Sequence, residues 1–433
     1  MTIISTSPFL PLELFFMIID QVRDDKATLA GCTLVSRSWL APASKHLFRE
    51  IDIRGQEQLL HFYNFVSSAH FLSRFVKKLV LWSYDDTEEE TLEFDVLKVA
   101  EILANLPRVD ELSILGLSIL PIDPRRNVDL IQCIPRPMKT VVFGDIIFDA
   151  SIYEFLQEAI LAPSLESLML RELHRLLSFF SSVHTMHLEV DCPYFTCPGL
   201  LDLENLPPLL DFSVENLTLN ADGCVVDLIR NSATPQALTT LQCMPYEECS
   251  NDAVQELLDV SPELRDLRFV RYHADGPETC GLPMASFDLS RNGKLQSIHL
   301  EAQLVRGFHS IHFATLYLAP WLRTLSTAPG TIQEISFDFC IPPSPEGTPG
   351  AEYLKDKVVI NQEAVVQLGA GWSQLDTILD RFPSLVKVEF TAAYLTSTDG
   401  ITGDPWEGVS DHICECMPRT RERKVLVFGV SHF

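Results

Sequence analysis

The chain is short of positive charge. Its 433 residues contain 33 Lys and Arg against 59 Asp and Glu, which gives a formal net charge of −26 at pH 7. A surface of that sign repels the phosphate backbone of nucleic acids and favours basic or neutral partners. We therefore expect no nucleic-acid partner. Residues 1–54 carry as many acidic as basic side chains, so the excess negative charge lies entirely in the remainder of the chain.

Long apolar runs are also missing. No uncharged apolar run reaches the roughly 18 residues that mark a membrane-spanning helix. The apolar N-terminal stretch has no basic segment before it and is interrupted by Pro11 and Glu13, unlike a signal peptide. The 11 cysteines are odd in number and scattered, which is typical of reduced intracellular thiols rather than of a disulfide framework. We therefore expect a protein of the cytoplasm or nucleus without a membrane partner.

The sequence motifs of catalysis and metal binding are absent as well. The two close cysteine pairs, Cys192/Cys197 and Cys414/Cys416, have no second pair at zinc-site spacing. The run at residues 369–372 has two glycines but lacks the third glycine of a phosphate-binding loop. No His-Glu-x-x-His or Gly-x-Ser-x-Gly pattern occurs. We expect no metal, no cofactor and no catalysis; an enzyme using a cleft of the acidic part remains the alternative, which would need a pocket with perturbed titratable groups.

What the sequence does contain is a strongly apolar N-terminal stretch. Pro11 suits the first position of a helix, where its missing N–H costs nothing. Apolar residues then recur at helical spacing from Leu14 to Val22, and Asp24 and Asp25 can cap a following helix. This is more apolar surface than about 45 residues can bury alone, since chains that short are marginally stable. Part of the stretch is therefore expected to meet another protein.

The order of residues in this stretch follows a known pattern. The matching residues are Leu10, Pro11, Glu13, Leu14, Ile18, Leu34, Val35 and Trp39. With Leu47-Phe48, they make residues 8–53 resemble an F-box, closest in style to the F-box proteins of mushroom-forming fungi. The resemblance implies three helices that dock on the Skp-type adaptor of a cullin-RING ubiquitin ligase, some of these residues facing the adaptor and others holding the helices together. Gly31 departs from the helix former usual there; the alternative is an ordinary helical cap with Leu and Ile as its core.

The rest of the chain repeats a short strand-like phrase, in which two apolar residues flank one residue of any type after a turn signal. The phrases are residues 78–81, 111–114, 140–143, 167–170, 185–188, 216–219, 240–243, 266–269, 297–300, 334–337, 387–390 and 425–428. A spacing of about 32 residues indicates a solenoid of strand–turn–helix units. Units such as Leu165–Leu170 resemble irregular leucine-rich repeats. The asparagine ladder of regular repeats is missing, so the turns must satisfy their backbone groups differently.

Amphipathic helices are expected between the phrases. Their ranges are 96–106, 152–161, 225–229, 253–260, 309–318 and 364–382. The predicted fold is therefore α/β: an F-box-like three-helix module (1–54), a linking helix (55–74) and an irregular leucine-rich-repeat-like solenoid (75–433). A Pro/Gly-rich insertion is expected near 341–352. The acidic run at 85–95 is expected to be a solvated loop, with a docking patch for a basic partner as the alternative.

These features predict a substrate-recognition subunit of an SCF-type ligase, which would join the adaptor, and through it a cullin, to an unknown protein substrate. The middle residue of each phrase points outward by strand alternation. The candidate partner-binding residues on the concave face are Ser113, Ser167, His187, Thr218, Gln242, Arg268, His299, Ser336 and Glu389. The alternative is a repeat scaffold that binds a protein without any ligase.

Overall fold

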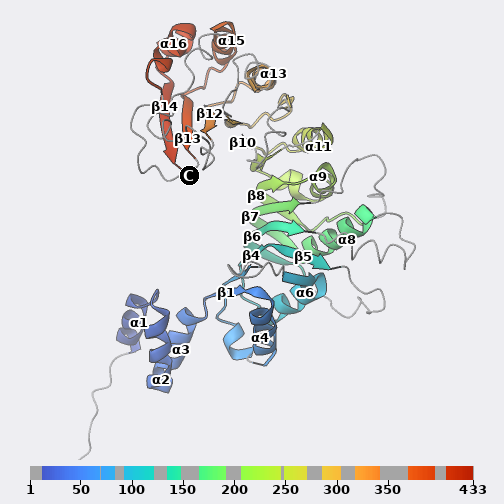
Figure 1. The fold of residues 1–433 in the computed structure, drawn as a ribbon, viewed down its shortest axis with the longest axis vertical. Helices are drawn as coiled ribbons and strands as arrows, with labels where there is room; N and C mark the ends of the chain where they lie inside the picture. The colour runs from blue at the N-terminus through green and yellow to red at the C-terminus, as the bar shows by residue number, and fades with distance from the viewer. Residues whose placement is uncertain are drawn as a thin grey trace, which may run out of the picture. The chain divides into compact units, whose positions relative to one another are not determined.

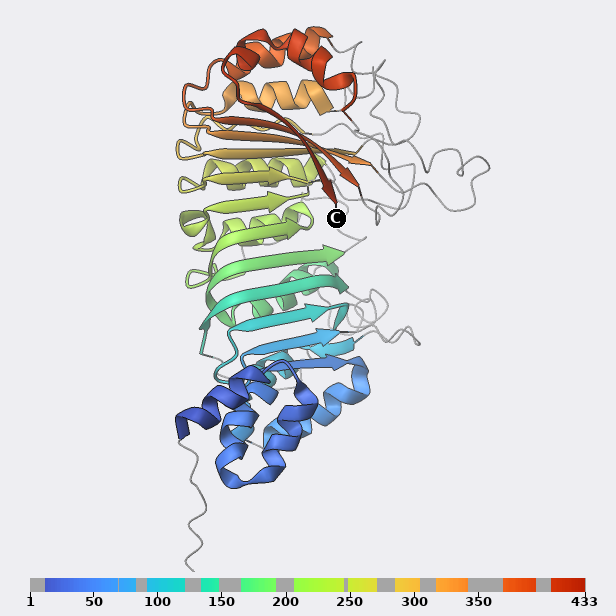
Figure 2. The same cartoon turned by 90° about the vertical axis from the view of Figure 1, so that its left-hand side faces the viewer.

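The computed structural model of the chain describes residues 12–68, 70–82, 92–120, 134–147, 165–191, 206–244, 248–270, 285–303, 317–341, 369–394 and 406–432. The expectations for Leu10, Pro11, the insertion beyond residue 341 and residues 85–91 lie outside these ranges. The solvated loop expected over residues 85–95 is wrong at its end, because residues 92–95 form a strand paired with residues 117–120. The chain forms two compact units, Met1–Cys192 (unit 1) and Pro193–Phe433 (unit 2). Each unit contains parallel strands with helices packed against them (Figures 1 and 2). No helix in the described ranges is long and apolar enough to span a membrane.

Unit 1 begins with three short helices, which are α1 (Leu12–Gln21), α2 (Lys26–Val35) and α3 (Arg37–Leu47). Ile19, Leu29 and Ala43 are completely buried between them, one from each helix. Asp25 caps α2, as predicted, because its side chain accepts hydrogen bonds from Thr28 N at 3.0 Å and Thr28 Oγ1 at 2.6 Å. The hydrogen bond from the Thr28 hydroxyl, followed by the one from its amide, lowers the pKa of Asp25. The three helices therefore share a small core of their own.

The parallel sheet of unit 1 starts directly after these helices. Its strands β1 (Glu50–Arg54), β2 (Lys78–Trp82), β4 (Glu111–Leu115), β6 (Arg136–Ile147) and β7 (Phe180–Asp191) pair in that order. Off this path, β5 (Leu117–Leu120) pairs with β6, and β3 (Leu92–Asp95) pairs with β5. Its helices are α4 (Gly55–Ser68), α5 (His70–Ser73), α6 (Val96–Asn105) and α8 (Leu165–Leu177). The sheet thus begins at Glu50, inside the range expected for the helical module. Gly55 makes the turn into α4 with a φ of +74°, a conformation that favours glycine.

Unit 2 repeats the same strand–turn–helix pattern. Its strands, all parallel, are β8 (Ser213–Asn220), β9 (Thr240–Cys243), β10 (Asp266–Phe269), β11 (Ser297–Gln303), β12 (Glu334–Ile341), β13 (Lys387–Tyr394) and β14 (Leu426–His432). Its helices are α9 (Gly223–Arg230), α10 (Thr234–Ala237), α11 (Glu248–Asp259), α13 (Ala319–Thr327), α15 (Gly369–Leu379), α16 (Val409–Cys416) and α17 (Pro418–Glu422). The apolar positions of the phrases pair in register into a buried ladder of Leu217, Leu241, Leu267, Ile298, Ile335 and Val388.

One predicted strand is wrong. Residues 167–170 belong to helix α8 and not to a strand. The apolar pattern continues beyond the phrase, because Leu170, Leu173 and Leu177 are buried at spacings of three and four residues, and this period favours a helix over a strand. The other phrases fall on strands. Helices α6, α9, α11 and α15 overlap their predicted ranges, whereas residues 152–161 and most of 309–318 lie outside the described ranges.

Aromatic side chains fill the core of unit 2 between β12–β14 and the helices. The Phe390 ring lies 5.1 Å from that of Phe337, 5.5 Å from that of Phe428 and 5.9 Å from that of Trp372, measured between centroids. The glycine-rich run that opens α15 has a packing reason, since a Cβ on Gly371 would meet Leu318 Cδ2 at 2.4 Å. Gly371 therefore permits a close approach between α15 and Leu318.

Long polar side chains satisfy the turns between helices and strands. Each reaches back to two or three backbone carbonyl groups of the preceding repeat, at donor–acceptor distances of 2.8 to 3.4 Å. The donors and the carbonyl groups they bind are Arg136 (Leu103 and Leu106), Asn292 (Leu258 and Ser261) and Arg423 (Leu379, Phe382 and Leu385). Individual side chains from different positions thus do what a continuous asparagine ladder would do.

Replacing Asn292 by alanine is expected to destabilise unit 2 by about 2 kcal/mol, because two buried carbonyl groups lose their donor. Asn292 is fully buried, so water cannot replace it without rearrangement. Urea unfolding followed by tryptophan fluorescence would measure the change. Asn231→Ala, at an exposed turn after α9, is the matched control. Equal midpoints for the two variants would contradict this role.

Candidate interaction surfaces

The strands of unit 2 place six of the predicted partner-binding residues in one continuous row. Register pairs join Thr218 to Gln242, then in order Arg268, His299, Ser336 and Glu389. Each is partly exposed, while its neighbours along the strand are buried on the opposite face. Helices α9, α11, α13 and α15 lie behind that buried face (Figure 1), and Figure 2 shows the strands from the uncovered side. The row therefore lies on the open face of the sheet.

Asp338 contacts three residues at the centre of this row. Its carboxylate accepts hydrogen bonds from His299 Nε2 and, at 3.1 Å, from Ser336 Oγ, and it lies 3.8 Å from Arg268 Nη2. Burial by itself raises the pKa of Asp338, but the hydrogen bonds from His299 and Ser336 and the charge of Arg268 outweigh it, so the pKa is held below its usual value. One buried carboxylate thus fixes the side-chain positions of three residues of the row.

Sequence reasoning missed Asp338. It follows Ser336 by two residues on β12, so strand alternation places both side chains on the same face. Extending each phrase by two residues would have found it. The charges on Asp338 and Arg268 are therefore part of the surface, although only 6% of the Asp338 side chain is exposed.

The serine, histidine and aspartate of this cluster are the residue types of a hydrolase triad, but their bonds differ. Ser336 and His299 each bond to Asp338, and no hydrogen bond joins the two within the described ranges. A nucleophilic serine needs a histidine that accepts its proton, so this arrangement does not activate Ser336. In the same ranges, no group of three His, Cys, Asp or Glu residues is placed to hold a metal ion.

Replacing Asp338 by asparagine is expected to destabilise the protein most near neutral pH. Because the pKa of Asp338 is lower in the folded protein than its usual value of 3.8, its charge contributes stability above that value. The contribution is lost as the pH falls through the lower, folded value. The difference in unfolding free energy between wild type and Asp338→Asn should therefore shrink below about pH 4. Urea titrations from neutral pH downward would measure it; a difference independent of pH would contradict the assignment.

The corresponding row of unit 1 holds two of the predicted residues. Register pairs align Val80 with Ser113, then Val142 and His187, so Ser113 and His187 flank a valine. His187 Nε2 lies 3.6 Å from Glu189 Oε2 on the same strand. Ser167 belongs to helix α8, so its placement in a strand row is wrong. This row is less polar than that of unit 2.

The three N-terminal helices carry a second surface, which is apolar. Leu34 is 87% exposed and Val35 67%, and Leu14 and Ile18 on α1 are each more than 40% exposed. Glu13 is also exposed. Met17 on α1 is 61% exposed as well, although the motif did not single it out.

Trp39 differs from these residues. It packs against the core of the three helices, and its ring lies 4.9 Å from that of Phe15 in an edge-to-face contact. The residues selected from the sequence therefore divide into an exposed set on α1 and α2 and a partly buried residue on α3. Leu10 and Pro11 lie outside the described ranges.

Comparison with known proteins gives little beyond this geometry. No protein-family model and no curated protein matches the chain. The crystal structure of the leucine-rich repeat-containing protein LegL7 from Legionella pneumophila is similar at 13% sequence identity, over 82% of this chain and 94% of that chain, with a TM-score of 0.32. A TM-score this low does not establish a common fold, so the repeat architecture rests on the strand register and the strand–turn–helix order described above.

Proposed function

We propose that the chain is the substrate-recognition subunit of an SCF-type cullin-RING ubiquitin ligase. Helices α1–α3 dock on a Skp-type adaptor, as their resemblance to an F-box implies, and the open face of the repeat sheet binds a target protein. The adaptor links the chain to a cullin. The chain forms no covalent bond itself; it accelerates ubiquitin transfer by holding the target near the charged ubiquitin carrier. A protein with this role would act in the cytoplasm or nucleus.

The observation that carries the proposal is the exposure of Leu14, Ile18, Leu34 and Val35 on α1 and α2. The three helices bury only a small core of their own, so these side chains remain in water in the isolated chain. Burying a side chain of this size contributes about 1.5–3 kcal/mol. A partner groove that covers several of them therefore gains a substantial hydrophobic contribution, and helix-in-groove recognition uses such anchors.

The target-binding half of the proposal rests on the row from Thr218 to Glu389. Its residues offer donors, acceptors and both charges on a sheet whose other face is covered by helices. Lys387 and Glu389 pair at 2.8 Å, which raises the pKa of Lys387. A rigid polar surface of this kind suits protein recognition, because rigid elements hold binding groups in fixed geometry.

Reconstitution tests the proposal. The full chain is mixed with a purified Skp-type adaptor, and the complex is measured by size-exclusion chromatography and calorimetry. A stable one-to-one complex is the expected result. Failure of the folded wild-type chain to bind the adaptor would refute ligase membership and leave the alternative, a repeat scaffold that binds a protein without a ligase, which the row on unit 2 equally supports.

A further inference from the structure

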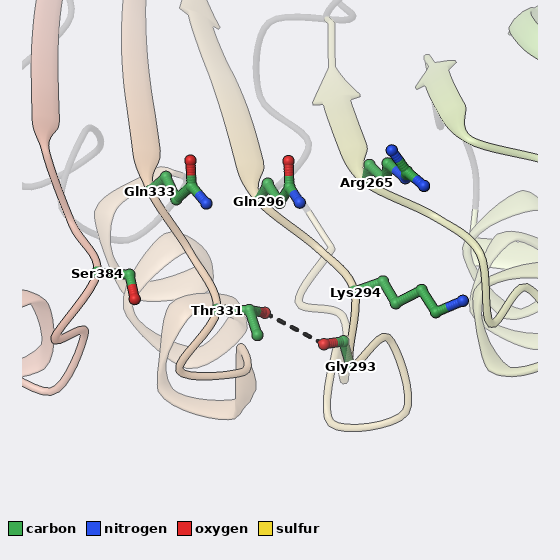
Figure 3. A pocket seen from close by; sticks show the side chains of 7 residues that line it. All are labelled: Arg265, Gly293, Lys294, Gln296, Thr331, Gln333 and Ser384. Carbon is green, nitrogen blue, oxygen red and sulfur yellow. Dashed lines mark hydrogen bonds between the residues drawn. The ribbon is translucent and has the colours of Figure 1, made fainter.

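A groove of about 360 Å³ lies at the edge of the unit 2 sheet where the strands begin (Figure 3). Arg265, Gln296 and Gln333 line it, and each directly precedes a strand, β10, β11 or β12. Backbone hydrogen bonds from Gln296 N to Arg265 O (2.7 Å) and from Gln333 N to Gln296 O (2.8 Å) hold the three residues side by side. Their side chains are thus presented at the spacing of neighbouring strands, about 4.8 Å.

The side chains of these three residues are exposed, and Asp266, next to Arg265 in the sequence, interacts with Arg265 electrostatically. Within the described ranges, Arg265, Gln296 and Gln333 make no side-chain hydrogen bond and no ion pair, and the hydroxyl of Ser384 at the far end of the groove makes none either. Thr331, by contrast, is already hydrogen-bonded, because its hydroxyl donates to Gly293 O at 3.3 Å and to Leu295 O at 2.7 Å. The groove therefore has fixed walls and free polar groups.

The same backbone position in unit 1 is paired. Lys77 and Asp110, joined there by the corresponding backbone hydrogen bond, lie 3.5 Å apart between charged groups, and Lys139 reaches Glu111 at 2.6 Å. Side chains at this position can therefore satisfy one another. In unit 2, Thr239 at this position bonds to Glu215 O at 3.2 Å, whereas Arg265, Gln296 and Gln333 make no such bond within the described ranges and stay available to a ligand.

The charges that line the groove indicate which kind of ligand it can bind. No carboxylate lines it, and Lys294 is neutralised by Glu263, whose two oxygens lie 2.6 Å from Lys294 Nζ. The cation that lines the groove without an ion pair is Arg265, whose neighbour in the sequence, Asp266, interacts with it electrostatically but does not line the groove. A planar guanidinium of this kind binds a carboxylate through two parallel hydrogen bonds. Gln296 and Gln333 each offer one amide donor pair and one acceptor, the complement of a peptide group.

We propose that this groove binds an acidic, extended segment of a target protein, with an Asp or Glu carboxylate on Arg265 and main-chain amides on Gln296 and Gln333. The inference deepens the target-binding half of the proposed function by naming the chemistry of the target. A small anion would occupy only the Arg265 end, whereas a polypeptide uses the whole row of side chains.

The test is selection of heptapeptides from a random display library on the full chain without adaptor. The enriched peptides are then made with a fluorescent label, and their affinity is measured by fluorescence polarisation. Enrichment in Asp and Glu is the expected result, with affinity lowered about tenfold or more by Arg265→Glu and about fivefold by Gln296→Ala with Gln333→Ala. The matched control is Arg323→Glu, which should leave affinity unchanged. Arg323 lies on helix α13, is exposed, and makes no side-chain hydrogen bond or ion pair with the residues that the structure describes.

Three outcomes would overturn the assignment. They are the absence of enrichment in acidic residues, unchanged affinity in Arg265→Glu, and complete displacement of the peptide by inorganic phosphate, which would mean a simple anion site. The altered side chains are exposed, so unchanged urea midpoints would show that the variants are folded. Adaptor docking is measured separately on α1–α3, so a failed peptide result leaves the ligase proposal standing, and a failed adaptor result leaves the groove standing.

Discussion

A chain carrying Leu14→Asp together with Val35→Asp is expected to lose binding to a Skp-type adaptor by roughly a hundredfold or more. Leu14 and Val35 are 42% and 67% exposed on α1 and α2, where they are free to enter a partner. An unpaired carboxylate buried in an apolar groove costs about 3–5 kcal/mol, which corresponds to that loss or more. Calorimetry of the purified pair, or co-purification from cells, would measure it.

The control for this experiment is Leu210→Asp. Leu210 is 72% exposed and lies in unit 2, so this variant introduces one carboxylate at an exposed apolar position outside α1–α3, and it is compared with each single variant as well as with the double variant. The double variant should keep the circular dichroism and urea midpoint of the wild type, because Ile19, Leu29 and Ala43 form the core of the three helices instead. Undiminished adaptor binding in the folded double variant would rule out the surface on α1 and α2 as the docking site.

Alternation in the sequence predicted the row on unit 2 because one face of each strand is buried. Because Leu267 and Phe269 are buried against the helices, Arg268 between them faces the opposite side of the sheet. The parallel register of the strands then aligns Arg268 with His299. The same reasoning failed at Ser167, because a short apolar run fits a buried helix as well as a strand. Only the longer period through Leu173 and Leu177 distinguishes the two structures.

Other features depend on contacts between distant residues and have no local signal. Arg136 and Arg423 bind turn carbonyl groups about 30 or 40 positions earlier, and nothing near them in the sequence identifies their partners. The groove at Arg265 is another case. Its residues lie just before the strands, where polar side chains are ordinary, and only the register of β10–β12 shows that Gln296 and Gln333 stand beside it.

Replacing Phe390 by alanine is expected to destabilise unit 2 by about 3–5 kcal/mol, the range for removing a buried aromatic ring. Phe390 is fully buried, and its ring contacts those of Phe337, Trp372, Trp406 and Phe428, which come from two strands and the segments between them. The neighbouring rings cannot shift far enough to fill the cavity left by Phe390, because the backbones that carry them are fixed in β12, β14 and α15. Urea unfolding followed by tryptophan fluorescence would report the loss directly.

Two further variants make this result specific to packing. Phe71→Ala removes a ring that is 53% exposed in unit 1 and should change stability by less than about 0.5 kcal/mol. Phe390→Leu keeps an apolar side chain at this position. It should lose less unfolding free energy than Phe390→Ala, since part of the volume of the ring remains filled. If Phe390→Ala unfolded no more easily than Phe71→Ala, the rings around Phe390 would not form the core that joins β12, β13 and β14. Target binding can be measured on the same variants. If Phe390→Ala weakens it and the other two variants do not, the core around Phe390 is what positions Ser336 and Glu389 on the open face.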